Sequence, residues 1–251
     1  MRAAGLDIGS RTIELVVVDA ESGEVVSSLE RETTPAVREE CARLLASVPY
    51  DRILVTGYGR NLAEAAFDAP SVTEIKAYAR GAEAVLPGCR TVVDIGGQDT
   101  KVIALDGKGR VATFEMNDRC AAGAGRFLEI MAAALGCTIE GFGEEALRGA
   151  EGVRLSSMCT VFAESEVVGM VTRGLPRADI ARAVHHAVLK RTVSMIRRVG
   201  SEGPLLFAGG AARNPCLARF LEDEIGAPVF VPENPQRIGA LGAALLAGTS
   251  I

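Results

Sequence analysis

The sequence contains an internal repeat built on the tripeptide Asp-Ile-Gly. Leu6-Asp7-Ile8-Gly9-Ser10 lies near the start of the chain, and Val93-Asp94-Ile95-Gly96-Gly97 recurs 87 residues later. Each copy is followed by an apolar segment in the same register, and by a second aspartate 12 residues after the first, Asp19 or Asp106. A turn sequence and a third apolar segment complete the likeness. The repeat therefore predicts two related lobes, each starting with three strands.

Helical periodicity and short buried strands alternate after each copy of the repeat. Alternation of this kind is typical of α/β lobes, in which helices pack on a sheet. We therefore expect an α/β fold with a first lobe over 1–88, a second lobe over 89–236, and a closing helix within 237–251 that packs on the first lobe. Helices are expected over 35–47, 73–85, 125–135, 163–173, 178–199, 214–225 and 237–247, and further strands over 52–56, 205–208 and 229–231.

Composition excludes several classes of protein. The formal net charge is −5, and aromatic residues make up only 4% of the chain, so neither a basic field nor a set of stacking platforms exists for nucleic acid. The longest nearly apolar run, 238–247, is too short to cross a bilayer. The N-terminus lacks a basic-then-apolar leader, and the six scattered cysteines do not form the pattern of a disulfide framework. We expect a cytoplasmic protein that binds neither nucleic acid nor a membrane.

Each Asp-Ile-Gly turn suits phosphate chemistry. Glycine lets the backbone approach closely, so that N–H groups can point at phosphate oxygens. The aspartate at the strand end can hold Mg²⁺ or orient an attacking water. Two such turns facing each other would clamp a triphosphate from both sides, whereas each turn taken alone is also consistent with an ordinary tight turn. The chain has no G-x-x-x-x-G-K-S/T sequence and no G-x-G-x-x-G turn.

A third glycine-rich turn, Gly209-Gly210-Ala211-Ala212 with Asn214 behind it, follows a buried strand and opens a helix. Because it has almost no side chain, such a turn can lie flat against an adenine or a ribose. Together with the two phosphate turns, it resembles the acetate and sugar kinase, Hsc70 and actin superfamily. The resemblance implies two ribonuclease-H-like lobes of duplicated ββαβα type, with ATP in the cleft between them and lobe closure driven by it.

Two cysteines, Cys120 and Cys159, stand just before predicted helices. The free N–H groups and the dipole at a helix N-terminus stabilise a thiolate, and the same field would stabilise an anionic iron–sulfur cluster. Two cysteines do not satisfy the four thiolate sites of a [4Fe-4S] cluster, but a twofold axis would supply the other two. From spacing alone, packed structural thiols are equally consistent with this pattern.

The sequences around these cysteines resemble one family closely. D-I-G-G-Q-D at 94–99, N-D-R-C-A-A-G-A-G-R-F at 117–127 and C-T-V-F-A-E-S-E at 159–166 look like the 2-hydroxyacyl-CoA dehydratase activators. That family also includes subunits of the ATP-dependent benzoyl-CoA reductase and reductases of double-cubane cluster proteins. Gly57-Tyr58-Gly59-Arg60, Glu74-Ile75 and the segment 239–244 match as well, so the resemblance covers nearly the whole chain.

The resemblance implies an ATP-dependent one-electron activator. It assigns Cys120 and Cys159 to one [4Fe-4S] cluster shared by a homodimer, with ferredoxin or flavodoxin as electron donor and a dehydratase or reductase that carries iron–sulfur clusters as partner. Asp7 and Asp94 are our candidates for Mg²⁺ and for organising the attacking water, assisted by Gln98 or Asp99. The predicted ATP and ADP contacts are Gly9, Ser10, Arg11, Gly96, Gly97 and Gln98 at the phosphates and Gly209, Gly210, Ala211, Asn214 and Gln236 near the adenosine.

Some positions depart from the family pattern. Ala124 and Met158 stand where Thr is expected, and Tyr78 stands where His is expected. The loss of hydroxyl groups beside a cluster could alter hydrogen bonds to sulfur and hence its potential, but it removes no ligand. These changes leave open whether the partner is a 2-hydroxyacyl-CoA dehydratase, a double-cubane protein or an aryl-CoA reductase.

Two readings from other classes stay open. A small-molecule kinase of the same fold would contain no iron, and an ATP-switched assembly or chaperone module would use its cysteines only for packing. The remaining candidate residues are expected to be structural. His185-His186 lacks a matching ligand pair and is expected on an ordinary helix surface, and a packing role is expected for Cys41, Cys89, Cys137 and Cys216.

Overall fold

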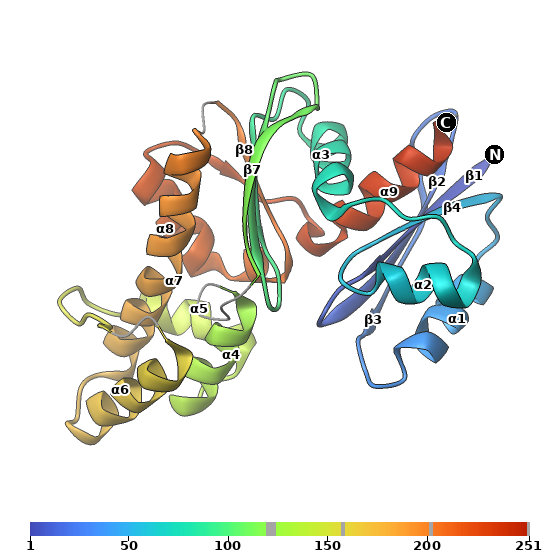
Figure 1. The fold of residues 1–251 in the computed structure, drawn as a ribbon. Coiled ribbons are helices and arrows are strands. Elements are labelled where there is room, and N and C mark those ends of the chain that lie inside the picture. The colour runs from blue at the N-terminus through green and yellow to red at the C-terminus, as the bar shows by residue number, and fades with distance from the viewer. Residues whose placement is uncertain (119–123, 157–158, 201–202, 250–251) are drawn as a thin grey trace. The chain divides into compact units, whose positions relative to one another are not determined.

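The computed structural model describes residues 1–118, 124–156, 159–200 and 203–249. The described residues form a four-stranded sheet with the order β3-β2-β1-β4 and a five-stranded sheet with the order β7-β6-β5-β8-β9 (Figure 1). Helices follow the strands in both halves, and each half begins with three strands. The predicted α/β fold class is confirmed.

The central strands β1 and β2 of the four-stranded sheet are buried on both faces. Strand β1 pairs antiparallel with β2 and parallel with β4, with Asp7 opposite Glu14 and Thr56. Alternate residues of β1 and β2 point to opposite faces, and both strands are almost entirely apolar because both faces are covered. The elements are β1 (Arg2–Ile8), β2 (Thr12–Asp19), β3 (Val25–Glu32) and β4 (Arg52–Thr56), with α1 (Val37–Ser47), α2 (Arg60–Phe67), α3 (Glu74–Val85) and α9 (Ile238–Gly248).

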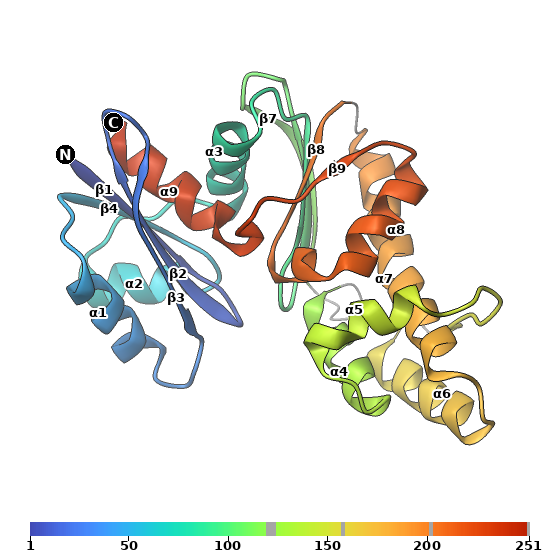
Figure 2. The same cartoon turned by 180° about the vertical axis from the view of Figure 1, so that it is seen from behind.

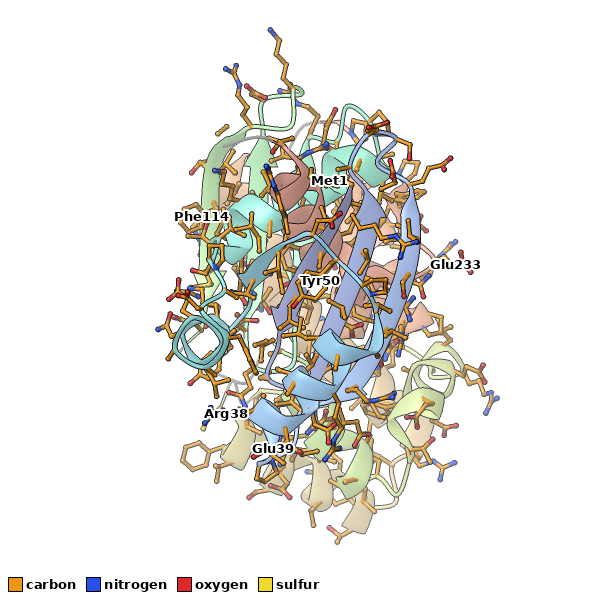
Figure 3. All side chains as sticks on the ribbon, turned by 90° about the vertical axis from the view of Figure 1, so that its right-hand side faces the viewer. Met1, Arg38, Glu39, Tyr50, Phe114 and Glu233 are labelled. Atoms are coloured by element: carbon orange, nitrogen blue, oxygen red, sulfur yellow. The ribbon has the colours of Figure 1, made fainter. Side chains whose placement is uncertain are left out.

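Two helix layers cover this sheet. One core joins Leu6, Ile8 and Leu15 to α1 and α2. Figure 3 shows α1 on this side, with Arg38 and Glu39 labelled, in front of the strands. The other core joins Val16 and Val18 to α3 and α9. The closing helix α9 therefore packs beside the first strands of the chain, as the red and blue ribbons of Figure 1 show.

Glycines allow α9 to approach its neighbours closely. A Cβ atom at Gly5 of β1 would overlap the carbonyl oxygen of Ala240, and one at Gly242 of α9 would overlap that of Ala77 in α3. A Cβ atom at Gly239 would overlap the carboxylate of Asp7. Because these residues have no side chain, the beginning of α9 lies directly against the first Asp-Ile-Gly turn.

The five-stranded sheet carries the larger core. Val93, Ile95, Val102 and Phe207 on one face of the sheet pack against helices from the second half of the chain, which Figure 2 shows around β8 and β9. The strands are β5 (Thr91–Ile95), β6 (Thr100–Leu105), β7 (Val111–Asn117), β8 (Leu205–Ala208) and β9 (Val229–Phe230), and the helices are α4 (Gly125–Ala134), α5 (Ile139–Leu147), α6 (Thr160–Thr172), α7 (Arg177–Val199) and α8 (Pro215–Ile225).

The chain divides into two compact units. The first unit comprises Met1–Val92, Ile103–Phe114 and Pro232–Ile251, and the second comprises Val93–Val102 and Glu115–Val231. The predicted lobe boundary between residues 88 and 89 stays a prediction. No helix among the described residues is both long and apolar enough to cross a membrane.

Two helices were not expected from the sequence. Helix α2 is only eight residues long and follows the glycine-containing segment 57–59. Helix α5 contains two glycines, which lower helix propensity. One of them is required by packing, since a Cβ atom at Gly143 would overlap the side chain of Asn214. Tertiary contacts, rather than local propensity, therefore account for α5.

Candidate functional site

The two Asp-Ile-Gly turns share one backbone geometry. In the first turn, the N–H of Gly9 donates to the carbonyl oxygen of Thr12 at 2.9 Å. In the second turn, the N–H of Gly96 donates to that of Asp99 at 3.0 Å. The two donors are 87 residues apart in the sequence, and so are the two acceptors. The repeat seen in the sequence therefore extends to the hydrogen bonds that close the two turns.

Each aspartate lies against a glycine that follows a neighbouring strand. A Cβ atom at Gly57, after β4, would overlap Oδ1 of Asp7, and a Cβ atom at Gly209, after β8, would overlap Oδ1 of Asp94. Both glycines have positive φ angles, 93° and 83°. Side-chain space and backbone conformation therefore both require glycine here. Sequence reasoning assigned Gly209 to the adenosine turn but missed its match with Gly57, which also directly follows a short buried strand.

The two turns differ in what holds their carbonyl oxygens. The carbonyl oxygen of Gly9 accepts a hydrogen bond from Oγ1 of Thr33 in the segment after β3, at 2.9 Å. The carbonyl oxygens of Gly96 and Gly97 instead accept from the N–H groups of Gly125 and Arg126, each at 2.8 Å. These two N–H groups belong to the first turn of α4, where backbone donors have no partner within the helix. The second turn is thus tied directly to the start of α4.

The two sites also differ in charge. Nζ of Lys101 lies 3.1 Å from Oδ2 of Asp94 and 2.7 Å from Oδ2 of Asp99, and the side chains of Lys101 and Asp94 are almost fully buried. In the first unit, Glu14 is buried opposite Asp7, and its Oε2 lies 3.8 Å from Nε of Arg237. Sequence reasoning singled out neither Lys101 nor Glu14. The sequence feature that marks each of them is a charged residue inside an otherwise apolar strand.

The other predicted phosphate-turn residues lie at the surface or near it. Ser10, Gly96 and Gly97 are half-buried, and Arg11 and Gln98 are exposed. These residues are therefore accessible from solvent, as contact with a nucleotide requires. Their assignment to ATP stays a prediction.

The third glycine-rich turn leads into a well-capped helix. Residues Gly210–Arg213 form a short 3-10 turn. Oδ1 of Asn214 then accepts hydrogen bonds from the N–H groups of Cys216 and Leu217, at 3.0 and 3.3 Å, at the start of α8. Asn214 is thus an N-cap residue, which explains its place behind the turn. The adenosine contacts predicted for Gly209, Gly210, Ala211 and Asn214 stay predictions.

His185 is not on a helix surface, and this prediction was wrong. Its ring is fully buried, Nδ1 lies 2.7 Å from the carbonyl oxygen of Ala181, and Nε2 lies 2.9 Å from Nδ2 of Asn214. Burial lowers the pKa of His185 to about 4. The helical pattern alone did not indicate this, because the partner residue comes from a distant part of the chain. His186 is partly buried and stacks on Phe220, with ring centroids 4.3 Å apart.

Gln236, predicted near the adenosine, belongs to the first unit. Its side chain is buried, and Nε2 donates a hydrogen bond to Oε2 of Glu30 at 2.5 Å. Gly209 and Gly210 belong to the second unit. The adenosine role of Gln236 stays a prediction.

Of the two predicted cluster ligands, Cys159 is described and Cys120 lies outside the described residues. Cys159 is exposed at the N-cap position of α6, and its carbonyl oxygen accepts from the N–H of Ala163 at 2.8 Å. The segment before it is tied to the same helix, because Glu166 accepts hydrogen bonds from the N–H and Oγ of Ser156, at 2.9 and 3.0 Å. The thiol of Cys159 is therefore presented to solvent at the N-terminus of a long helix.

The other described cysteines have different surroundings. Cys41, Cys89 and Cys216 are buried, and Cys137 is partly buried. Burial raises the pKa of the Cys41 thiol to about 11 and that of Cys216 to about 12. Such thiols stay protonated and pack as small apolar groups. Within the described part of the chain, no group of three or more His, Cys, Asp or Glu side chains is placed to hold a metal ion by itself.

Two of the three departures from the family pattern are described. Ala124 is buried at the N-cap position of α4, where it supplies no side-chain hydrogen bond to the helix. Tyr78 is buried in α3, next to Gly239 at the start of α9. Met158 lies outside the described residues.

Comparisons with known proteins agree over nearly the whole chain. The 2-hydroxyisocaproyl-CoA dehydratase activator of Clostridioides difficile is 40% identical over 98% of this chain and 95% of its own. A solved structure of the activator from Clostridium difficile, with bound ADPNP, has a TM-score of 0.89 and 38% identity over 99% of this chain and 94% of that one.

A second solved structure is similar to the same extent. Component A of the (R)-2-hydroxyglutaryl-CoA dehydratase from Acidaminococcus fermentans has a TM-score of 0.90 and 34% identity, and the match covers 99% of this chain and 98% of that one. The family described as the BadF/BadG/BcrA/BcrD ATPase family matches residues 4–247. The chain therefore belongs to the BadF/BadG/BcrA/BcrD ATPase family.

Proposed function

We propose that the chain couples ATP hydrolysis to one-electron transfer and thereby activates a 2-hydroxyacyl-CoA dehydratase. The observation that carries this proposal is its 40% identity, over 98% of its length, to a protein named as a dehydratase activator. The family name supports ATP hydrolysis, and the ADPNP bound to a relative that is 38% identical supports nucleotide binding. Transfer of an electron and its coupling to hydrolysis are our extension of these findings.

The two Asp-Ile-Gly turns are the proposed phosphate contacts, through Gly9, Ser10 and Arg11 and through Gly96, Gly97 and Gln98. Asp7 and Asp94 are the proposed carboxylates for Mg²⁺ and for the attacking water. Both are buried beside glycines, so their positions are closely restricted. A carboxylate held in one position can orient a water molecule or a hydrated cation without reorganising during the reaction.

Cys159, with Cys120, is the proposed ligand of a [4Fe-4S] cluster that a homodimer shares. Cys159 is exposed at the start of α6, where backbone N–H groups have no partner within the helix and can face an anionic group. A bound cluster would supply a site that accepts and donates one electron. Because each chain contributes only two thiols, a second copy is needed to complete four. Both residues fit this role by type, and Cys159 fits it by position.

The hydrogen bonds between the second phosphate turn and α4 support the proposed coupling. The carbonyl oxygens of Gly96 and Gly97 accept from the first two N–H groups of α4, the helix that follows the segment containing Cys120. A nucleotide that draws the turn toward its phosphates would therefore pull on the start of this helix. Binding can drive such a change only if ATP has different affinities for the two conformations.

The test is ATP-dependent activation of a purified 2-hydroxyacyl-CoA dehydratase under anaerobic conditions, with reduced ferredoxin or flavodoxin as donor. We expect dehydratase activity with ATP and none with ADPNP. Activation of a double-cubane cluster protein or an aryl-CoA reductase instead would redirect the partner assignment only. ATP consumption that rises with a sugar or an organic acid, by a protein without iron, would favour a small-molecule kinase and refute the electron-transfer proposal.

A further inference from the structure

Lys101 is a buried cation between two carboxylates of the second phosphate turn. Its side chain is 3% exposed, and its ammonium lies 3.1 Å from Asp94 and 2.7 Å from Asp99. Asp94 precedes the glycines of the turn, and Asp99 follows them. One ammonium group thus joins both ends of the segment 96–98.

The internal repeat shows that the fold does not require a lysine here. Residue 14 is the counterpart of residue 101, just as Asp7 is the counterpart of Asp94. Glu14 occupies that position in the first unit, equally buried on the strand after the turn. The same strand position therefore accepts either sign of charge. A positive charge at this place is a property of the second turn alone.

The ammonium changes the charge that an incoming phosphate would meet. Asp94 and Asp99 would together present two negative charges beside the backbone of the turn. At an effective dielectric constant near 20, an uncompensated carboxylate beside the turn would repel an anion bound there. Lys101 neutralises much of this repulsion, and its compact ammonium can contact two carboxylates at once. It also fixes the carboxylate of Asp99, whose Oδ1 lies so close to Gly96 that a Cβ atom there would approach it to 2.7 Å.

We propose that Lys101 is a positioning residue, a built-in counter-cation that holds Asp94 and Asp99 and lets the second phosphate turn accept a nucleotide phosphate beside these two carboxylates. This inference rests on the proposed function, because it assumes that the turn contacts the phosphates of ATP or ADP. It makes a specific prediction about charge. The benefit of Lys101 should grow with the negative charge of the nucleotide.

The experiment measures the dissociation constant of ADP by calorimetry for the full chain, once with EDTA and once with excess Mg²⁺. Free ADP carries more negative charge than its magnesium complex. We expect Lys101→Met to weaken ADP binding at least about tenfold in EDTA, and clearly less with Mg²⁺. Lys101→Arg should restore most of the affinity. The control is Lys190→Met, the same change at an exposed position of α7, which should leave both constants unchanged.

A second variant covers the case in which Lys101→Met does not fold. Asp99→Asn removes one of the two negative charges and keeps the buried pair of Lys101 and Asp94. We expect it to bind ADP more tightly than the wild type in EDTA, whereas a merely structural ion pair would give unchanged or weaker binding.

The outcomes separate this inference from the proposed function. If Lys101→Met weakens ADP binding equally with and without Mg²⁺, Lys101 has a structural role only, and the inference is overturned. If the wild type binds ADP and Lys101→Met binds it with the same affinity, the inference is overturned as well, and the proposed function stays intact. If the wild type binds no adenine nucleotide, both the inference and the proposed function are contradicted.

Discussion

Asn214 and His185 form a buried side-chain pair that joins the cap of α8 to the middle of α7. Nδ1 of His185 lies 2.7 Å from a carbonyl oxygen, which only accepts, so this nitrogen carries the proton. Nε2 is therefore the acceptor, and Nδ2 of Asn214 donates to it at 2.9 Å. Oδ1 of Asn214 remains available to accept from the backbone of α8. The neutral histidine thus fixes the orientation of the residue that follows the third glycine-rich turn.

This pair predicts a loss of stability at acid pH. The pKa of His185 is lowered from its ordinary value of 6.5 to about 4, chiefly by burial and further by the nearby His186, against hydrogen bonds with Ala181 and Asn214. Between these values the unfolded chain binds a proton that the native chain does not. His185 therefore contributes full stability above pH 6.5, and about 3 kcal/mol of it is lost as the pH falls to 4.

Urea unfolding at pH 7 and pH 5 checks this prediction. We expect the wild type to lose more stability between these values than His185→Gln, because other titrating groups are common to both proteins. His186→Gln serves as the neighbouring control and should keep most of the wild-type pH dependence. An identical pH dependence in the wild type and His185→Gln would contradict the account of the buried pair.

The link between the second phosphate turn and α4 predicts a variant that separates nucleotide binding from activation. Gly125→Pro replaces the N–H that donates to the carbonyl oxygen of Gly96 with a ring carbon that would overlap this oxygen, so the contact is broken, while proline suits the first position of a helix. Ala124 before it is extended, with φ −122° and ψ 173°, as a residue before proline prefers. Loss of one such hydrogen bond should lower dehydratase activation by about tenfold.

The matched control is Ile139→Pro, at the exposed first position of α5, after the extended residue Thr138. It should leave activation close to that of the wild type. ADP affinity should stay nearly unchanged in both variants. If Gly125→Pro activates the dehydratase as well as Ile139→Pro does, the bond between the turn and α4 does not carry the coupling.

Two glycines in helices should respond oppositely to the same substitution. A Cβ atom at Gly242 of α9 would overlap the backbone of α3, so Gly242→Ala should destabilise the protein by about 3 kcal/mol. Gly169 of α6 has open space around it, and Gly169→Ala should stabilise by about 0.5–1 kcal/mol through higher helix propensity. Urea midpoints of both variants test the prediction. Equal effects of one sign would contradict the close packing of α9.

Thiol accessibility predicts which described cysteines react. Without a cluster, Cys159 should be alkylated by iodoacetamide in the folded protein, because it is exposed. Cys41 and Cys216 are buried, and their pKa values are raised, so they should react only after unfolding. Peptide mapping by mass spectrometry distinguishes the sites. Rapid labelling of Cys216 in folded protein would contradict its burial in the core of the second unit.

Much of the fold followed from local sequence signals. The Asp-Ile-Gly repeat predicted two related turns, and each is closed by a backbone hydrogen bond of the same type. Asn214 before a helical pattern marked the start of α8. These signals lie within a few residues of the structure they specify. By contrast, the partner of Asn214 is 29 residues away in sequence.

Two of the features that were missed depend on contacts between distant segments. Gly57 matters because β1 and β4 are parallel neighbours, which brings it against Asp7. Helix α5 forms despite its glycines because one of them faces Asn214. The burial of Lys101 between Asp94 and Asp99 depends on how the turn folds back. The contacts of Gly57 and of α5 join distant segments, so no local pattern encodes them. Lys101 pairs with nearby residues, and its local signal was a charge inside an apolar strand.

The most direct test of the account is an anaerobic iron and sulfide analysis combined with native mass measurement. We predict about four iron and four sulfide atoms per pair of chains, in a dimer of twice 26.2 kDa that carries one cluster. Cys159→Ala should lose this iron, and Cys137→Ala should keep it. A metal-free single chain of 26.2 kDa from the same oxygen-free preparation would contradict the shared cluster and the electron transfer built on it.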